Sequence, residues 1–521
     1  MEIKKPRLKG LKELCFYAAL FLFSVVSYVI FTPLFDDFSG LPRGEAAKFF
    51  ALILLLGLAA IGFVLHRAGE LSRKRLILLI ILASFAIRLG YILYTEGDCR
   101  QHDTWGDVGH FAYADILFKK GILPETNDYQ FYHPPLNALI QSVFMHIFEW
   151  LFTLISNSMP SLPFSRYWLL NSETYFIACQ TLSLIYITVT TVFACKLFKA
   201  LGIRGNAGLL AMIFVCFYPR LVQFSGQLNN DPLCLMLSII ALYRAVLYYK
   251  VPSFKNIAIT GLFVGLAMMT KLNGATICFT IAVLFVLVFI KSVKAKEWRP
   301  VLKTISQFAV FLLIAAPIGL WFQIYASIRF DQGFGFVFSN LNPNLSTAHI
   351  PWFDRFFLPS AEAIFYSPFA DAWENYNLID YMLKSSLFGE FSFWNGTAFA
   401  VMAVFLNYVF SILFVITFVL FIINRKKQNK KLFDLPVIVL LSLLLSLLAS
   451  QVIFYIKMPY GCTMDFRYVV PIILSGGGLT ALMHKEAKAS PIKAFEAFAT
   501  LNCFAAISLV SVTSVFYLVC V

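Results

Sequence analysis

Residues 98–136 read DCRQHDTWGDVGHFAYADILFKKGILPETNDYQFYHPPL and lie between two long apolar runs. The stretch is rich in Asp and holds three of the seven His residues, although only 13% of the chain is charged. Ionisable groups beside a bilayer are costly, so such a cluster indicates a functional site more than an ordinary solvated loop. The side of the membrane on which this stretch lies decides the topology of the whole chain.

The composition excludes a soluble globular protein. Hydrophobic residues make up 60% of the 521 residues, and the mean hydropathy is +0.77. Crossing the bilayer core takes about 20 apolar residues in a helix. Apolar runs that we interpret in this way lie near residues 12–34, 47–66, 75–94, 134–156, 172–197, 206–224, 231–249, 257–270, 272–291, 303–324, 398–424, 433–457, 468–484 and 497–519. The sequence therefore predicts an all-α polytopic membrane protein.

Basic connectors fix the orientation, because short loops rich in Lys and Arg stay on the cytoplasmic side. They lie at residues 4–12, 67–75, 196–204, 244–255, 291–303, 425–431 and 484–493. An inside N-terminus places the connector 67–75 inside and the loop 98–136 outside. The net charge of +14 is then explained by these connectors, and it does not indicate nucleic-acid binding.

Successive connectors should lie on alternate sides of the membrane, and the run 134–156 does not fit this order if it is a span. If it crossed the membrane, the connector 196–204 and every later basic connector would fall outside. Because the run contains His146 and Glu149, we expect it to lie on the outer surface as an amphipathic helix. This gives about 13 spans, an inside N-terminus and an outside C-terminus.

The chain divides into four parts by this topology. The third part is rich in Trp and Phe, which favour the headgroup level, and we interpret it as a lid over a lipid site. The parts are an N-terminal two-span extension (1–74), a core module (75–324) with the first outer loop (95–171), an outer aromatic loop (325–397) and C-terminal spans (398–521).

Most of the ten Cys residues fall inside spans and act there as small apolar side chains. Cys99 and Cys462 are predicted on outer loops. The sequence leaves open a disulfide between them or two free thiols.

Polar clusters that are not cytoplasmic connectors all project to the outer face. Besides the loop 98–136 they are SGQLNNDPL (225–233), TKLNG (270–274), LFGEFSFWNG (387–396) and CTMDFRYVVP (462–471). In the first loop, Asp107, His110, Phe111 and Ala114 share one face of a predicted helix that ends near Lys120. Asp231 before Pro232 is a helix-start signal, with Asp231 as the N-cap.

The order of these motifs resembles that of the GT-C polytopic membrane glycosyltransferases. The similarity is to the protein-mannosyltransferase and aminoarabinose-transferase-like family of bacteria, which uses a polyprenyl-phosphate sugar on the outer face. It rests on Ala114 to Gly121, FYHPPL (131–136), NNDP (229–232), TKLNG and FRYVVP (466–471). No single motif decides it; their order does.

The resemblance implies roles for three carboxylates. Asp107, fourteen residues before Gly121, matches the first-loop Asp of the family, but Val108 stands where the family often has Glu. Asp103 is therefore the alternative. Asp231 matches the second outer acidic position.

These residue types suit a glycosyl transfer. One carboxylate can act as general base on an acceptor hydroxyl, and a single displacement inverts the anomeric centre. Lys271 and Arg467, with Tyr468 beside it, are candidates for binding the leaving phosphate, although both cations could also anchor headgroups. His110, His133 and Glu390 are further candidates for substrate binding.

Alternatives remain at two levels. His102, Asp103, Asp107 and His110 could bind a divalent cation, although their spacing is irregular. The second functional hypothesis is a transporter or flippase of a lipid-linked saccharide, which would usually show polar groups at the midplane. The spans look nearly free of ionisable residues, which favours transfer to a glycan, lipid or protein acceptor; neither the sugar nor the acceptor is identified.

Overall fold

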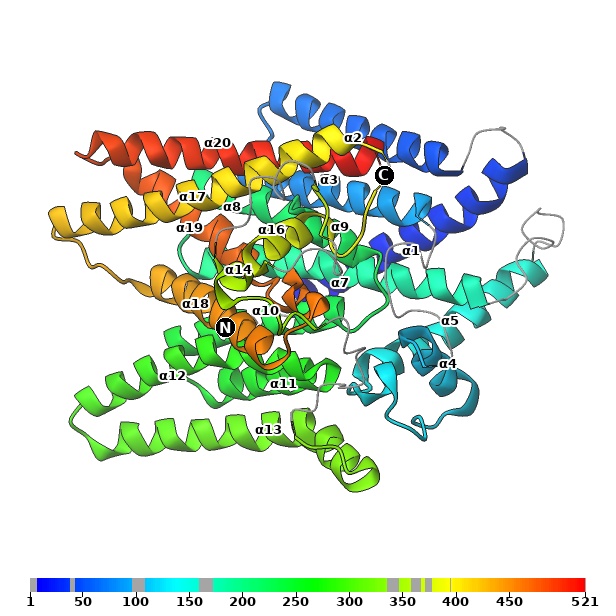
Figure 1. The fold of residues 1–521 in the computed structure, drawn as a ribbon, viewed down its shortest axis with the longest axis horizontal. Coiled ribbons are helices and arrows are strands. Elements are labelled where there is room, and N and C mark those ends of the chain that lie inside the picture. The colour runs from blue at the N-terminus through cyan, green and yellow to red at the C-terminus, as the bar shows by residue number, and fades with distance from the viewer. Residues whose placement is uncertain are drawn as a thin grey trace, which may run out of the picture.

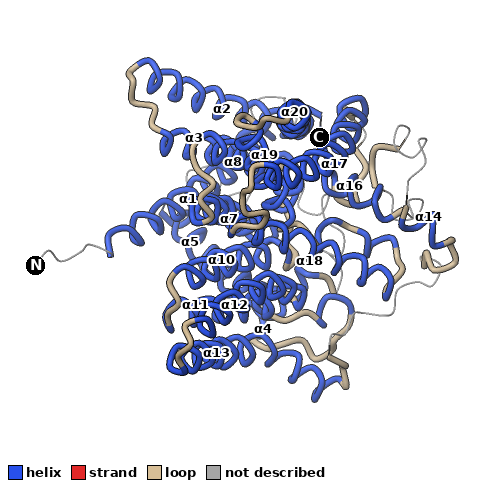
Figure 2. The backbone as a smooth tube through the Cα atoms, turned by 90° about the vertical axis from the view of Figure 1, so that its left-hand side faces the viewer, coloured by secondary structure: helices blue, strands red, loops and turns tan. Residues whose placement is uncertain are grey.

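The structure, a computed structural model, is built from helices throughout the part of the chain that it describes (Figures 1 and 2). It describes residues 7–37, 43–95, 108–158, 172–334, 346–357, 367–370, 377–393 and 395–520. Within these ranges there is no β-strand, only an isolated bridge between Ser346 and Tyr460. The predicted all-α class is confirmed. Cys99 lies outside the described residues, so both alternatives for Cys99 and Cys462, a disulfide or two free thiols, stay open.

The helices fall into two groups, long ones of 18 residues or more and shorter ones. The long ones are α1 (Arg7–Asp37), α2 (Arg43–Arg67), α3 (Arg73–Tyr94), α5 (Leu136–Ser158), α7 (Ser172–Ala200), α10 (Asp231–Lys250), α12 (Ile277–Lys294), α13 (Trp298–Phe330), α17 (Thr397–Lys427), α18 (Leu435–Lys457) and α20 (Lys493–Val515). The shorter ones are α4 (His110–Lys120), α8 (Asn206–Cys216), α9 (Pro219–Ser225), α11 (Phe254–Thr270), α14 (Trp352–Phe356), α16 (Leu378–Phe388) and α19 (Ile472–Ala487). Single turns are η1 (Tyr129–Tyr132), η2 (Leu272–Thr276), η4 (Gly461–Met464), η5 (Phe466–Tyr468) and η6 (Phe516–Cys520).

Among the described residues, nine helices are long and apolar enough to cross a membrane, or ten if the bent pair α8 and α9 counts as one span. The predicted number of 13 is not confirmed. Part of the difference lies in α11 and α19, which have only 17 and 16 residues, fewer than the roughly 20 that a full crossing needs.

α10 is the central helix of the bundle. In both views α2 and α20 lie at one edge and α11 to α13 at the other, with α7 and α10 between them (Figures 1 and 2). Of the most apolar stretch of α10, 72% is buried, against 6% for α2. The helix that begins with Asp231 is therefore enclosed by protein, whereas α2 is exposed on most of its surface.

The chain bends by 51° between α8 and α9. Pro219 opens α9, where its missing N–H costs nothing. At the end of α8, the buried Arg88 of α3 donates an Nη2–H bond of 2.7 Å to the carbonyl oxygen of Cys216. Arg88 thus satisfies a carbonyl that the bend leaves open. Arg88 and Arg220 are fully buried inside apolar runs, so the expectation that the spans are nearly free of ionisable residues is wrong at these two positions.

The segment 226–230, between α9 and α10, is buried although it is not helical. Buried carbonyls need partners, and side chains of α5 and α7 supply them. Asn137 and Gln141 donate to the carbonyl oxygen of Leu228 at 3.2 and 2.8 Å, and Gln180 donates to that of Gly226 at 2.8 Å. This fixed segment holds the start of α10 in place.

α5 is helical over Leu136–Ser158, as the amphipathic pattern predicts. It is not among the candidate membrane spans found in the described residues. Its inward face carries the amides that bind the segment 226–230. That α5 lies along the membrane surface stays a prediction.

The turn between α11 and α12 depends on Gly274 of the TKLNG motif. Lys271 ends α11, and η2 follows directly. A Cβ at position 274 would lie 2.6 Å from the carbonyl carbon and oxygen of Ala267, which are backbone atoms and cannot rotate away. Only glycine therefore lets η2 fold back against α11.

We expect Gly274→Ala to lower the free energy of unfolding by about 1 to 3 kcal/mol, the usual cost of overpacking. Thermal unfolding of the purified protein in detergent measures this. Gly57→Ala in α2 is the control, because nothing lies within 4 Å of its Cβ position. Equal unfolding temperatures for the two variants would contradict the predicted role of Gly274.

Candidate functional site

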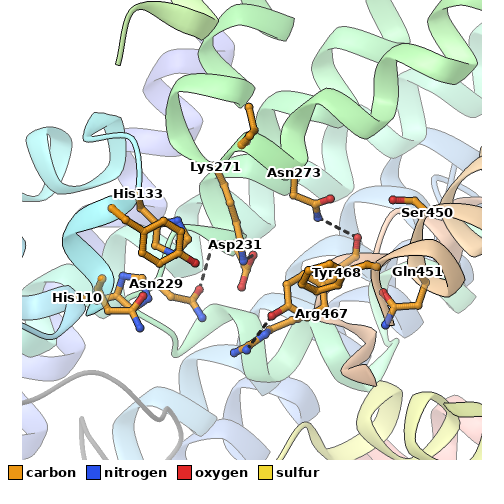
Figure 3. Close-up of a pocket in the computed structure, with 14 residues that line it drawn as sticks. His110, His133, Asn229, Asp231, Lys271, Asn273, Ser450, Gln451, Arg467 and Tyr468 are labelled. Atoms are coloured by element: carbon orange, nitrogen blue, oxygen red, sulfur yellow. Dashed lines mark hydrogen bonds and ion pairs between the residues drawn. The ribbon is translucent and has the colours of Figure 1, made fainter. Parts of the chain in front are cut away.

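A cavity of about 310 Å³ gathers residues from six separate segments. Figure 3 shows His110, His133 and Asn229 on one side, Ser450 and Gln451 on the other, and Lys271 with Asp231 between them. Its walls are formed by His110, Gln130, Tyr132, His133, Asn229, Asp231, Lys271, Leu272, Asn273, Ser450, Gln451, Phe454, Arg467 and Tyr468.

The cavity lies at the helix ends that are opposite to the basic connectors. α10 begins at the cavity with Asp231 and ends at Lys250. α11 reaches the cavity at Lys271, and α12 leaves it toward Lys294. Polar clusters and basic connectors, which are separate along the sequence, therefore lie at opposite ends of one bundle.

Asp231 and Lys271 form an ion pair in the middle of the cavity. Lys271 Nζ lies 2.6 Å from Asp231 Oδ1, and the two side chains are 13% and 6% exposed. The predicted cap role of Asp231 is wrong by one position: Asn230 is the N-cap residue, and Asp231 is the first residue of α10. Its backbone N–H donates to Asn229 Oδ1 at 3.1 Å, which leaves the carboxylate directed to Lys271.

Arg467 enters the cavity from η5. Its backbone N–H donates to Asp465 Oδ1 at 2.9 Å, and its Nη2–H donates to the hydroxyl of Tyr468 at 3.1 Å. Its charge contacts to Glu390 and Asp465 are long, 3.6 and 3.8 Å. Burial lowers the pKa of Arg467, but the adjacent Tyr468 and these carboxylates raise it well above its ordinary value, so the guanidinium stays charged.

Glu390 lies behind Arg467 and does not line the cavity. Besides its ion pair with Arg467 it accepts a hydrogen bond of 3.1 Å from the hydroxyl of Tyr381 on α16. Burial, and to a smaller extent the negative charge of Glu390, raises the pKa of the Tyr381 phenol well above its ordinary value. Glu390 thus contacts Arg467, which lines the cavity, and its predicted role in substrate binding stays a prediction.

The two predicted histidines face each other across the first loop. The rings of His110 and His133 stack with centroids 5.8 Å apart and planes 10° apart. Burial, followed by the nearby charge of Lys271, lowers the pKa of His110 to about 3 and that of His133 well below its ordinary value. Both rings are therefore neutral at pH 7 and can each donate and accept one hydrogen bond.

Six predicted site residues meet in the cavity: Asp231, His110, His133, Lys271, Arg467 and Tyr468. Asp103 and Asp107 lie outside the described residues, as does His102. In the part of the chain that the structure describes, no three His, Cys, Asp or Glu residues are grouped as metal ligands would be. The divalent-cation alternative depends mainly on residues outside that part.

Sequence reasoning missed several polar residues of the site. Asn273 donates to the carbonyl oxygen of Tyr468 at 3.0 Å and so joins TKLNG to η5. Arg220 and Asp465 form a fully buried pair directly behind Arg467. A charged residue inside the apolar run 206–224 was the available signal for Arg220, because intramembrane charges are rarely without a role.

Comparison with known proteins bears on the same region. Residues 171–321 match the family model of dolichyl-phosphate-mannose-protein mannosyltransferases. The matched segment runs from the end of the first outer loop into α13 and contains Asp231 and Lys271. It confirms the resemblance to the GT-C glycosyltransferases and supports a membrane glycosyltransferase. A search of curated proteins found no match to the chain.

The neutral histidines predict how stability depends on pH. Because the folded-state pKa of His110 is about 3 and the unfolded value is about 6.5, the unfolded chain binds more protons between these pH values. Stability is therefore fully present above about pH 6.5 and is lost as the pH falls toward 3. We expect His110→Gln to reduce the fall in unfolding temperature between pH 7.5 and pH 5. An identical fall in both proteins would contradict a His110 that is neutral in the folded protein.

Proposed function

We propose that the chain is an inverting glycosyltransferase that moves a sugar from a polyprenyl-phosphate donor to an acceptor hydroxyl on the outer face of the membrane. The observation that carries the proposal is the cavity, in which Asp231, Lys271 and Arg467 meet at the end of the bundle opposite to the basic connectors. Since basic connectors stay in the cytoplasm, this end is the outer one. The family match supports the reaction type.

Lys271 and Arg467 are proposed to bind the donor phosphate. Both line the cavity, and in a partly dehydrated site their attraction to a phosphate is stronger than in water. Arg467 can offer two parallel N–H groups, and Lys271 a point charge. As the glycosidic bond breaks, negative charge grows on the leaving phosphate, and these cations stabilise it.

The first loop is proposed to supply the general base. Asp231 Oδ1 already accepts from Lys271 at 2.6 Å, and such a pair favours the ionised carboxylate and weakens its affinity for a proton. We therefore propose that Asp231 holds Lys271, and that Asp107, or Asp103 as the alternative, takes the acceptor proton. Asp107 lies three residues before His110 in the chain, and His110 lines the cavity.

Sugar transfer from a radiolabelled polyprenyl-phosphate sugar by the purified protein tests this assignment. We expect Asp107→Asn to lower kcat by about 10²- to 10⁴-fold, the usual contribution of a general base. Asp115→Asn is the matched control, since Asp115 lies in the same loop and pairs with the exposed Lys119. Loss of turnover in Asp103→Asn with an active Asp107→Asn would move the base to Asp103. Full activity in both would exclude a catalytic first loop.

An apolar groove of about 590 Å³ continues from the cavity between α12 and α18. Cavity and groove share Ser450 and Phe454. The groove walls are mostly apolar, with Phe279 from α12 and Ala449 and Ile453 from α18. A lipid whose phosphate lies at Lys271 and Arg467 could place its isoprenoid chain there, which favours a lipid-linked donor over a soluble sugar nucleotide.

The groove gives a second test. Ala449→Trp would fill it, so we expect the KM for a long-chain donor to rise about tenfold while a short, water-soluble isoprenoid donor is used as before. Leu448→Trp is the control, because Leu448 is exposed on the same helix but does not line the groove. An equal effect on both donors would argue against an isoprenoid in the groove.

The same assays distinguish the proposed glycosyltransferase from a flippase, since a transporter would bind the donor without turning it over. Arg88 and Arg220, the intramembrane charges that could suggest transport, contact a helix end and a carboxylate and do not line the cavity. Dependence of turnover on a divalent cation is tested by adding EDTA. The acceptor, whether glycan, lipid or protein, is to be found by supplying each class to the active enzyme.

A further inference from the structure

A fully buried ion pair lies directly behind Arg467. The Nη2 of Arg220 donates to both carboxylate oxygens of Asp465, each at 2.8 Å, and both side chains are 1% exposed. The other terminal nitrogen of Arg220 donates to Gln223 Oε1 at 2.7 Å. Burying two charges is costly, so this geometry must do more than fill space.

Asp465 contacts two arginines, Arg220 closely and Arg467 at longer range. It accepts two short hydrogen bonds from the Arg220 side chain. The Arg467 side chain lies 3.8 Å from its carboxylate, which also accepts the backbone N–H of Arg467. The Nε of Arg467 is buried and has no hydrogen-bond partner. Arg467 is thus anchored by its backbone, while its guanidinium is only weakly engaged by Asp465.

Other contacts fix Arg220 in this place. A Cβ on Gly389 would lie 2.3 Å from Arg220 Nη1, so only glycine allows this close approach, at a φ of +67°. Glu390, the next residue, is the second carboxylate that faces Arg467. On the other side, Ser385 Oγ accepts the backbone N–H of Phe466 at 3.0 Å. Both acidic segments around Arg467 therefore pack against or beside Arg220.

The charges of the cluster balance only with Arg220 included. Its carboxylates are Asp231, Glu390 and Asp465, and its cations are Arg220, Lys271 and Arg467. Without Arg220, three carboxylates would share two cations. Asp465 would then turn to Arg467, the other cation that contacts it among the described residues, and would compete with any substrate anion for it.

We propose that Arg220 is a positioning residue that occupies Asp465 and so keeps the Arg467 guanidinium available to the donor phosphate. The inference rests on the proposed function, because it takes Arg467 as a phosphate ligand. Arg220 itself does not line the cavity and touches no substrate. The proposed effect of Arg220 on Arg467 passes through Asp465, which contacts both arginines.

Binding of polyprenyl phosphate, measured without turnover in detergent, tests the inference. We expect Arg220→Gln to weaken binding about tenfold, the size of one charge-assisted hydrogen bond lost by the phosphate. Adding Asp465→Asn to Arg220→Gln should restore affinity close to that of the wild type, because no carboxylate is left to capture Arg467. In an Arg467→Met background, Arg220→Gln should have no further effect.

Controls separate this role from a purely structural one. Unfolding temperature and gel-filtration profile report whether each variant folds, and Arg244→Gln, at the opposite end of α10, should leave binding unchanged. If Arg220→Gln folds and binds as the wild type does, or if its effect persists in the Arg467→Met background, the inference is overturned and the proposed function stands. Failure of the wild type itself to bind polyprenyl phosphate overturns the proposed function and the inference with it.

Discussion

The buried pair between Arg220 and Asp465 imposes the constraint on which the cavity depends. A charge inside an apolar bundle is stable only with a partner at close range, and removal of one partner would cost about 3 to 5 kcal/mol. This pair joins α9, the second half of a bent span, to the turns between α18 and α19. Because the two residues must meet, the bend at Pro219 and the position of η5 are coupled, and η5 carries Arg467.

The cavity exists because several helices end early at one end of the bundle. The backbone leaves regular helix at residues 226–230, at η2 and at η4 and η5, and each break exposes polar groups that lipid cannot satisfy. Side-chain amides, some of which belong to another break, form hydrogen bonds with these groups instead. Asn273 in η2, for example, donates to the carbonyl oxygen of Tyr468 in η5. The breaks therefore gather in one place, and the polar side chains beside them line a common cavity.

The sequence predicted the helical class and six of the fourteen residues that line the cavity, because both follow from local patterns. Runs of apolar residues mark helices, and the segregation of polar motifs from basic connectors placed Asp231, Lys271 and Arg467 at one end. The pair of Arg220 and Asp465 could not be predicted, since its members are 245 positions apart and no local pattern connects one with the other. The predicted number of 13 spans is not confirmed, because length alone does not decide whether short helices such as α11 cross a membrane.

If the proposed function holds, partial neutralisation of both cavity cations suits the release of a lipid-phosphate product. Asp231 contacts Lys271, and Glu390 contacts Arg467 at a longer distance, so neither cation offers its full charge to a resting phosphate. Two unpaired cations would already bind the donor phosphate tightly in the ground state, and binding that is equally strong in ground state and transition state does not accelerate the chemical step. A phosphate that gains negative charge as its bond to the sugar breaks competes better with these carboxylates than the donor does. Under the proposed function, the pairing would thus shift the attraction of Lys271 and Arg467 toward the transition state.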